Sequence, residues 1–174
     1  MGLVKTEIVL MAFPGREVWL DQCMKSIGKR DVMILSGYGH ELDKIRWVYE
    51  NTNIDRFLLL QDSMVIKDQK FFDLALSHPK SVAFSNCPVK FGMYMGVFCR
   101  ETLAKTNMPV VRDKEHGIEL EISWANEYSY HEPDAPLLFE TFHDHHAKGV
   151  VNLHGRRNLV LENEYIIKYK GTWR

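Results

Sequence analysis

The first sixty residues alternate between continuous apolar runs and amphipathic segments. The apolar runs at residues 8–13, 32–35 and 57–60 have the length and composition of buried β-strands. Between them, residues 16–27 and 41–49 place apolar side chains at helical spacing. This alternation predicts the order strand, helix, strand, helix, strand, with parallel strands joined by right-handed crossovers.

The remaining sequence alternates less regularly but still contains recognisable elements. We therefore predict one α/β domain over residues 1–174, with a central, mostly parallel sheet flanked by helices. The later elements predicted from local patterns are helices at 68–77, 100–105 and 118–128, strands at 81–84, 91–99, 150–153 and 165–169, and a polar loop at 110–117.

Composition narrows the possible partners and the compartment. The net charge of −1 gives no general electrostatic reason to expect nucleic acid as a partner. No apolar run approaches the roughly 20 residues that a membrane-spanning helix needs, and we expect no signal peptide. Three cysteines without a CxxC motif indicate a reducing environment. We therefore expect a cytoplasmic protein.

Asp62 follows the third apolar run, with only Gln61 between them. The carboxyl ends of parallel strands lie at the same edge of a sheet, and open α/β sheets bind ligands at that edge. The pattern therefore predicts that Asp62 lies at a ligand-binding edge. The simpler interpretation is that Asp62 only caps the turn into the next helix.

Four segments carry a resemblance to a known family: residues 13–27, 57–63, 92–103 and 153–155. Together they resemble the GT-A fold glycosyltransferases, which transfer a sugar from a nucleotide-sugar donor. Residues 57–63 look like the apolar strand of that family that ends in an Asp-x-Asp motif. This chain has one acid there, Asp62, flanked by Gln61 and Ser63.

The resemblance implies a glycosyltransferase that moves a sugar from a UDP-, GDP- or dTDP-linked donor to an acceptor that the sequence does not identify. Arginine suits contacts with phosphate oxygens, whereas solvated surface arginines are the commoner case. The expected donor-binding residues are Ala12, Phe13, Arg16, Gln61, Asp62, Arg156 and Arg157.

The expected cofactor is a divalent cation. A nucleotide-sugar releases a highly charged diphosphate, and Mn²⁺ or Mg²⁺ can neutralise the developing charge. Asp62 is the expected carboxylate ligand, and the resemblance adds His154 as a nitrogen ligand, which would favour Mn²⁺. The alternative is that His154 is an ordinary surface residue.

A transfer that inverts configuration needs a general base to deprotonate the acceptor hydroxyl. The resemblance places such an acid near residue 118, and the candidates are Glu119 and Glu115. The sequence predicts Glu115 in the loop and Glu119 in the first turn of the helix. An acid in a first turn also stabilises a helix through its dipole, which is the alternative role for Glu119.

The segment from His143 to His146 holds three histidines and one aspartate. Such a cluster can bind transition metals, but its spacing does not match that of metallohydrolases. We expect adventitious zinc or nickel there rather than a catalytic ion.

Two other functions remain open from the sequence. The first is a non-catalytic nucleotide-sugar or glycan-binding protein on the same fold, which the single acid of residues 61–63 favours. The second is a sugar nucleotidyltransferase. That enzyme class usually carries a glycine-rich loop with a downstream lysine, for which residues 13–16 offer little support.

Overall fold

The computed structural model describes residues 6–37, 39–84, 90–91, 95–140, 148–151 and 157–170, with the backbone alone for 148–151, 157–158 and 170. The helices are α1 (Glu17–Ile27), α2 (Glu41–Asn51), α3 (Lys70–Leu76), α4 (Arg100–Leu103) and α5 (Lys114–His131). The strands are β1 (Thr6–Met11), β2 (Val32–Leu35), β3 (Arg56–Gln61), β4 (Met64–Ile66), β5 (Val82–Ala83), β6 (Gly96–Cys99), β7 (Lys148–Val151), β8 (Arg157–Glu162) and β9 (Ile166–Lys170).

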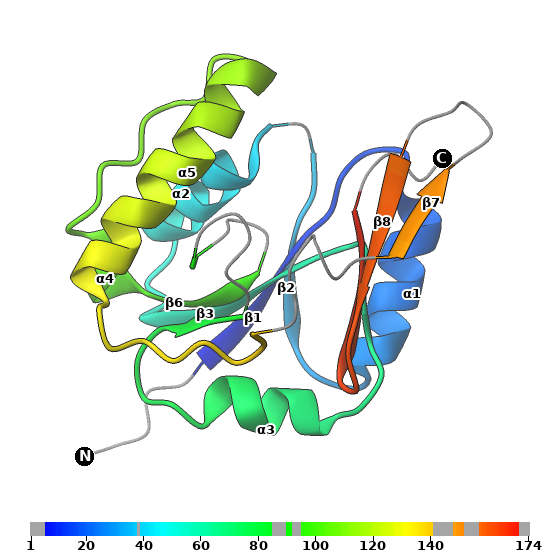
Figure 1. Cartoon of the computed structure of the whole chain (residues 1–174). Coiled ribbons are helices and arrows are strands. Elements are labelled where there is room, and N and C mark those ends of the chain that lie inside the picture. Colours follow the sequence, from blue (N-terminus) through cyan, green and yellow to red (C-terminus); the bar gives the residue numbers. More distant parts are fainter. Residues whose placement is uncertain are drawn as a thin grey trace.

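A five-stranded sheet with the order β2-β1-β3-β6-β5 forms the centre of the protein (Figure 1). Strand β1 pairs in parallel with both β2 and β3, as the alternation of the first sixty residues predicts. Strand β6 lies between β3 and β5 and runs antiparallel to both. The chain is therefore an α/β protein whose sheet is mixed. Among the described strands of this sheet, β2, β1 and β3 pair in parallel, and Ala83 of β5 adds an isolated parallel bridge to Leu137.

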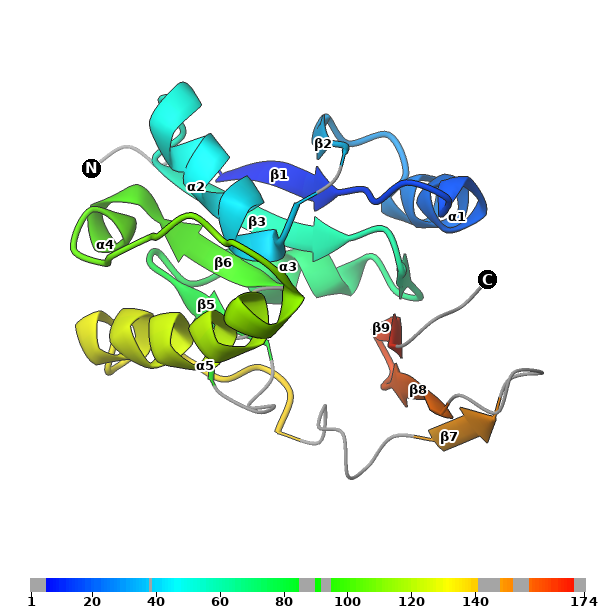
Figure 2. The same ribbon diagram turned by 90° about the horizontal axis from the view of Figure 1, so that it is seen from above.

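The central strands bury both of their faces, because successive side chains point to opposite sides. In β1, Ile8 and Leu10 pack in one hydrophobic cluster, whereas Val9 and Met11 pack in the other. Helices α1 and α3 contribute to the first cluster, and α2, α4 and α5 contribute to the second. Figure 2 shows α2, α4 and α5 together on one side of the sheet.

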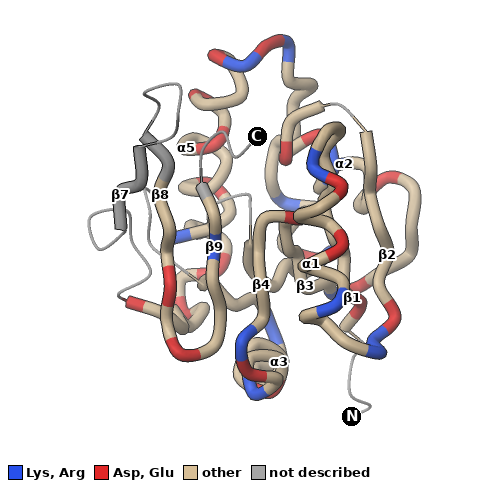
Figure 3. The backbone as a smooth tube through the Cα atoms, turned by 90° about the vertical axis from the view of Figure 1, so that its right-hand side faces the viewer, with Lys and Arg blue, Asp and Glu red and all other residues tan. Residues whose placement is uncertain are grey.

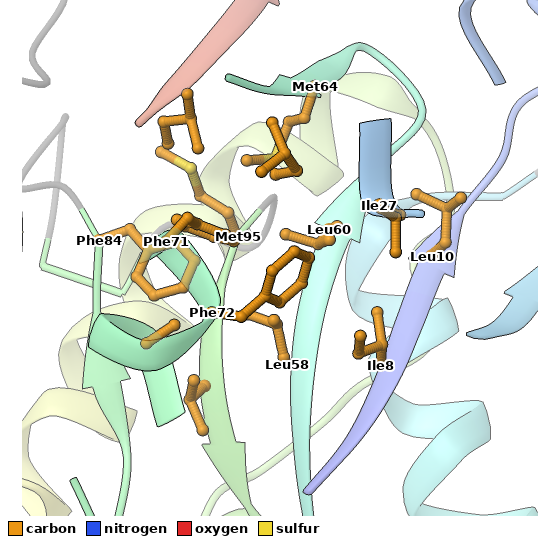
Figure 4. Close-up of a cluster of buried hydrophobic side chains, with 14 of the residues drawn as sticks. Ile8, Leu10, Ile27, Leu58, Leu60, Met64, Phe71, Phe72, Phe84 and Met95 are labelled. Carbon is orange, nitrogen blue, oxygen red and sulfur yellow. The ribbon is translucent and has the colours of Figure 1, made fainter. Parts of the chain in front are cut away.

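Aromatic side chains from α3 fill much of the first cluster (Figure 4). The ring of Phe71 lies 5.2 Å from that of Phe72 and 5.3 Å from that of Phe84, with edge-to-face geometry in both pairs. Such pairs add to the stabilisation that burial alone provides. Leu58 and Leu60 of β3 lie in the same cluster, which fixes the face of the strand that precedes Asp62.

A second, antiparallel sheet has the order β4-β9-β8-β7. Figure 3 shows β9 between β4 and β8. The sequence patterns predicted neither β4 nor β8, because three residues are too few for a periodic signal and residues 157–162 lack strict alternation. Strand β7 begins at Lys148 rather than at the predicted residue 150. Because β4 starts two residues after Asp62, this sheet brings β9 to the end of β3.

Helix α5 begins four residues earlier than the sequence predicted. The side chain of Asp113 accepts a hydrogen bond of 2.8 Å from the backbone N–H of His116, and this N-cap starts the helix at Lys114. The predicted loop at 110–117 is therefore wrong in its last four residues. Glu115 lies in the first turn and Glu119 lies one turn further on, not in a loop and a first turn. None of the described helices is long and apolar enough to span a membrane.

Candidate functional site

Asp62 joins the carboxyl ends of β1 and β3. Its backbone N–H donates to the carbonyl of Met11 at 2.9 Å, and its Oδ2 accepts from the backbone N–H of Phe13 at 2.9 Å. The residue is only 1% exposed. The sequence predicted an aspartate at this edge of the sheet, and the structure places it there, held by the backbone on both sides.

The second oxygen of Asp62 faces a cation. Oδ1 lies 3.2 Å from a guanidinium nitrogen of Arg16. Although buried, it accepts no hydrogen bond from a described residue, so the pair is held by charge alone. Burial raises the pKa of Asp62, and the Phe13 N–H, Arg16 and Lys168 act in the opposite direction. The charged form of Asp62 therefore depends on these neighbouring donors and cations.

Lys44 of α2 supplies a further cation near the end of β1. Its Nζ lies 4.9 Å from the centre of the Phe13 ring and donates a hydrogen bond of 3.0 Å to the carbonyl of Gly37. Burial lowers the pKa of Lys44, while Glu41, Asp43 and Asp62 act to raise it. Phe13 also lies beneath Arg16, whose Cζ is 5.9 Å from the ring centre.

Gln61 and Ser63, which flank Asp62, both accept hydrogen bonds from Lys168 of β9. The Nζ of Lys168 donates to Oε1 of Gln61 and, over 2.6 Å, to Oγ of Ser63. The amide nitrogen of Gln61 donates to Oε1 of Glu41 at 2.7 Å. Lys168 is 2% exposed, so these hydrogen bonds form in a largely desolvated environment. The carboxamide of Gln61 thus connects a buried ammonium group to a carboxylate.

His40 links this edge of the sheet to α5. Its Nδ1 accepts a hydrogen bond from the backbone N–H of Leu42 at 3.3 Å, which caps α2. Its Nε2 lies 3.5 Å from Oε2 of Glu41. The ring packs so closely on Gly117 that a methyl group added there would lie 2.4 Å from Cδ2 of His40. The first turns of α5 therefore lie beside the start of α2.

The structure brings together five of the predicted donor-binding residues: Ala12, Phe13, Arg16, Gln61 and Asp62. Ala12 is buried, and its N–H donates to the carbonyl of Leu35 at 3.0 Å. The structure does not describe the side chains at the remaining predicted donor and metal positions. Arg157 begins β8 with its backbone alone described, and His154, Arg156 and the cluster from His143 to His146 lie outside the described residues.

Glu115 and Glu119 are exposed on α5. Neither carboxylate makes a hydrogen bond or an ion pair with another described residue. The contact between His40 and Gly117 brings their helix to the edge of the site, but no contact assigns either acid a role. Their function as general bases stays a prediction.

The described side chains do not form a divalent-metal site as they stand. No three of the described His, Cys, Asp and Glu residues gather in a group that could hold an ion. Asp62 faces the Phe13 N–H with one oxygen and the Arg16 guanidinium with the other. The flanking side chains of Gln61 and Ser63 hold an ammonium group. The use of Mn²⁺ or Mg²⁺, with His154 as a ligand, stays a prediction.

Three residues of this site, Glu41, Lys44 and Lys168, were not among the site residues predicted from the sequence. The strand pattern could have identified Lys168. It lies two residues after Ile166 and therefore on the same face of β9, and both residues are buried. A lysine at an inward position of a strand indicates a buried polar partner. No local pattern distinguished Glu41 or Lys44 from the solvated face of an amphipathic helix.

Comparison with models of protein families, with curated proteins and with solved structures finds no match to this chain.

Proposed function

We propose that the protein is a GT-A-like glycosyltransferase that moves a sugar from a nucleotide-diphosphate sugar to an acceptor hydroxyl. The observation that carries this proposal is the buried Asp62, paired with Arg16 at the joined ends of β1 and β3. A buried charge at the carboxyl edge of parallel strands is costly for folding, and such charges concentrate at functional sites. The resemblance supplies the reaction class.

The proposed reaction places a clear electrostatic demand on the site. The bond between the anomeric carbon and the diphosphate oxygen breaks, and its electron pair stays on the diphosphate. The acceptor oxygen bonds to the anomeric carbon, and the acceptor proton passes to a base. Negative charge therefore develops on the leaving diphosphate, where fixed positive charge lowers the barrier. Arg16 is suited to this role, because its side chain is 23% exposed while Asp62 fixes its position.

Glu119 and Glu115 are the proposed bases of an inverting reaction. Their exposure on α5 leaves their carboxylates free to meet an acceptor. Glu119→Gln and Glu115→Gln test this role separately, because each removes the basic oxygen while it keeps the shape of the side chain. Loss of turnover with unchanged donor binding in one variant would identify the base. Full activity in both would remove both residues from the mechanism.

A metal-assisted form of the reaction is part of this proposal. Asp62 and His154 would hold Mn²⁺ or Mg²⁺, and the ion would neutralise the diphosphate when bound. Asp62 would then have to exchange the ion pair with Arg16 for the metal.

Calorimetric titration with UDP-, GDP- and dTDP-sugars, with and without Mn²⁺, tests the proposed function. We expect one donor class to bind and Asp62→Asn to abolish sugar transfer. Asp134→Asn is the matched control, because Asp134 is exposed and distant in sequence from the site. The absence of binding by every nucleotide-sugar under all metal conditions would refute the proposal.

A non-catalytic nucleotide-sugar or glycan-binding protein is the second candidate. The specific observation in its favour is that neither Glu115 nor Glu119 makes a hydrogen bond or an ion pair with the described residues around Asp62. Donor binding without release of nucleoside diphosphate, in the presence of many acceptors, would favour this function over transfer.

A further inference from the structure

The two positions that flank Asp62 bind a cation that belongs to the chain itself. The Nζ of Lys168 lies between Oε1 of Gln61 and Oγ of Ser63, and both oxygens are neutral. These two hydrogen bonds hold the ammonium group of Lys168 in the interior, beside Asp62. The positive charge of Lys168 interacts electrostatically with Asp62 and acts to lower the pKa of its carboxyl group.

A glutamine at position 61 suits this arrangement better than an acid would. Its amide nitrogen donates to Glu41 at 2.7 Å while its amide oxygen accepts from Lys168. A carboxamide can donate to a carboxylate and accept from an ammonium group at the same time, whereas an ionised carboxylate has no donor for Glu41. A carboxylate at position 61 would face Glu41 at hydrogen-bond distance, and the two like charges would repel each other. The neutral residues beside Asp62 therefore match a site built around a lysine.

Arg16 provides a cation that an incoming anion can contact. It pairs with Asp62 at 3.2 Å but makes no hydrogen bond to another described residue. Its guanidinium N–H groups are thus available to an oxyanion, and a planar guanidinium is suited to paired phosphate oxygens. Lys44 adds a third positive charge nearby. These three cationic side chains lie among the carboxylates of Glu41, Asp43 and Asp62, and Asp43 is itself paired with Arg46 at 2.8 Å.

We propose that this site binds a diphosphate group without a divalent metal, with Arg16 in contact with the anion and Lys168 as the buried positive charge beneath it. This inference rests on the proposed function for the identity of the full ligand, a nucleotide-diphosphate sugar. Lys168 acts as a positioning residue, since it fixes Gln61 and Ser63 and sets the local potential. The anion site itself is defined by its chemistry and can be tested with a simpler ligand.

Titration of the full chain with inorganic pyrophosphate in the presence of EDTA tests the site directly. We expect binding that the chelator does not weaken and that added Mn²⁺ changes little. Lys168→Met should weaken the affinity by about tenfold or more, because it removes a charge in a region of low dielectric constant. Lys70→Met is the matched control, because Lys70 is exposed on α3, and we expect it to bind as the unmodified chain does.

Arg16→Gln is a second variant. It should disturb folding less than Lys168→Met does, because the side chain of Arg16 is partly exposed. It should weaken pyrophosphate binding to a similar degree, whereas Arg112→Gln, at an exposed arginine, should not. Pyrophosphate binding that requires Mn²⁺ or Mg²⁺ would overturn the inference. Unchanged affinity in both Lys168→Met and Arg16→Gln would also overturn it.

Nucleotide-sugars titrated under the same conditions separate this inference from the proposed function. Metal-free binding of pyrophosphate without binding of any nucleotide-sugar would support the anion site and refute the transferase. Nucleotide-sugar binding that depends strictly on a divalent ion would support the transferase and refute the metal-free site.

Discussion

The backbone N–H of Phe13 donates a hydrogen bond of 2.9 Å to Oδ2 of Asp62, forty-nine residues further along the chain. This contact closes the carboxyl end of β1 onto that of β3. It also holds in place a carboxylate that the protein has removed almost completely from water. Asp62 therefore contributes to the site at a cost to stability, and that cost can be measured.

Asp62→Asn should stabilise the fold at neutral pH while it abolishes function. Burial raises the pKa of Asp62 above its ordinary value of 3.8, so the folded chain binds this proton more readily than the unfolded chain does. The contribution of Asp62 to the free energy of unfolding therefore falls as the pH rises from that ordinary value through the raised pKa. Asparagine never ionises and can still accept the hydrogen bond from Phe13. We expect a gain of about 1 kcal/mol at neutral pH.

Urea denaturation of both proteins from about pH 4 to pH 8 measures this effect. The difference between Asp62→Asn and the unmodified chain should grow with rising pH. Asp134→Asn, at an exposed residue, should show no such trend. A difference that stays constant across this pH range would mean that the buried charge carries no cost.

Gly117→Ala should destabilise the protein, although alanine normally favours a helix over glycine. The added methyl group would lie 2.4 Å from Cδ2 of His40, so the ring that caps α2 would have to move. We expect a loss of about 1–3 kcal/mol, as for other overpacked positions.

A double-mutant cycle isolates the cause of this effect. In a His40→Ala background the ring is absent, and Gly117→Ala should be neutral or stabilising by about 0.5–1 kcal/mol. Equal destabilisation in both backgrounds would assign the cost to something other than His40. Thermal unfolding of the four proteins provides the measurement.

Glu132→Ala should destabilise the fold by about 2–3 kcal/mol, because it leaves buried hydroxyl groups without an acceptor. Glu132 lies just after α5 and accepts hydrogen bonds from Ser81, at 2.8 Å, and from Thr102. Ser81 in turn shares a hydrogen bond of 2.8 Å with Tyr128. Chemical denaturation gives the value, with Asp134→Ala as the exposed control. A loss no larger than that of the control would show that Glu132 does not hold α5 and α4 to β5.

Cys23 should resist alkylation in the folded protein. Burial is the main cause that raises its pKa to about 12, so near pH 8 only about one molecule in ten thousand carries the reactive thiolate. Peptide mapping after treatment with iodoacetamide should find Cys23 unmodified in buffer and fully modified in urea. Rapid modification under native conditions would show that α1 opens away from the sheet.

The C-terminal part of the site could not be predicted from local patterns. Lys168 reaches Gln61 across 107 residues, and it does so because the short strand β4 pairs with β9. A strand of three residues carries almost no periodic signal, and without it nothing in the sequence places residue 168 beside residue 61. The early start of α5 has a local cause, the N-cap of Asp113, whereas the close packing of Gly117 against His40 depends on the tertiary structure.

The sequence by itself determined the parallel arrangement of β2, β1 and β3 and the position of Asp62 at their carboxyl edge. Apolar runs and helical spacing can be read from local sequence. Strands that are joined by single helices pair in parallel with right-handed crossovers, so the order of these elements predicts this topology. Only the tertiary structure decided the reversed direction of β6, the second sheet and the partners of Asp62. Those features depend on contacts between distant residues. The partly exposed charges of Arg16 and Glu41 and the buried charge of Lys168 come together only after the chain has folded.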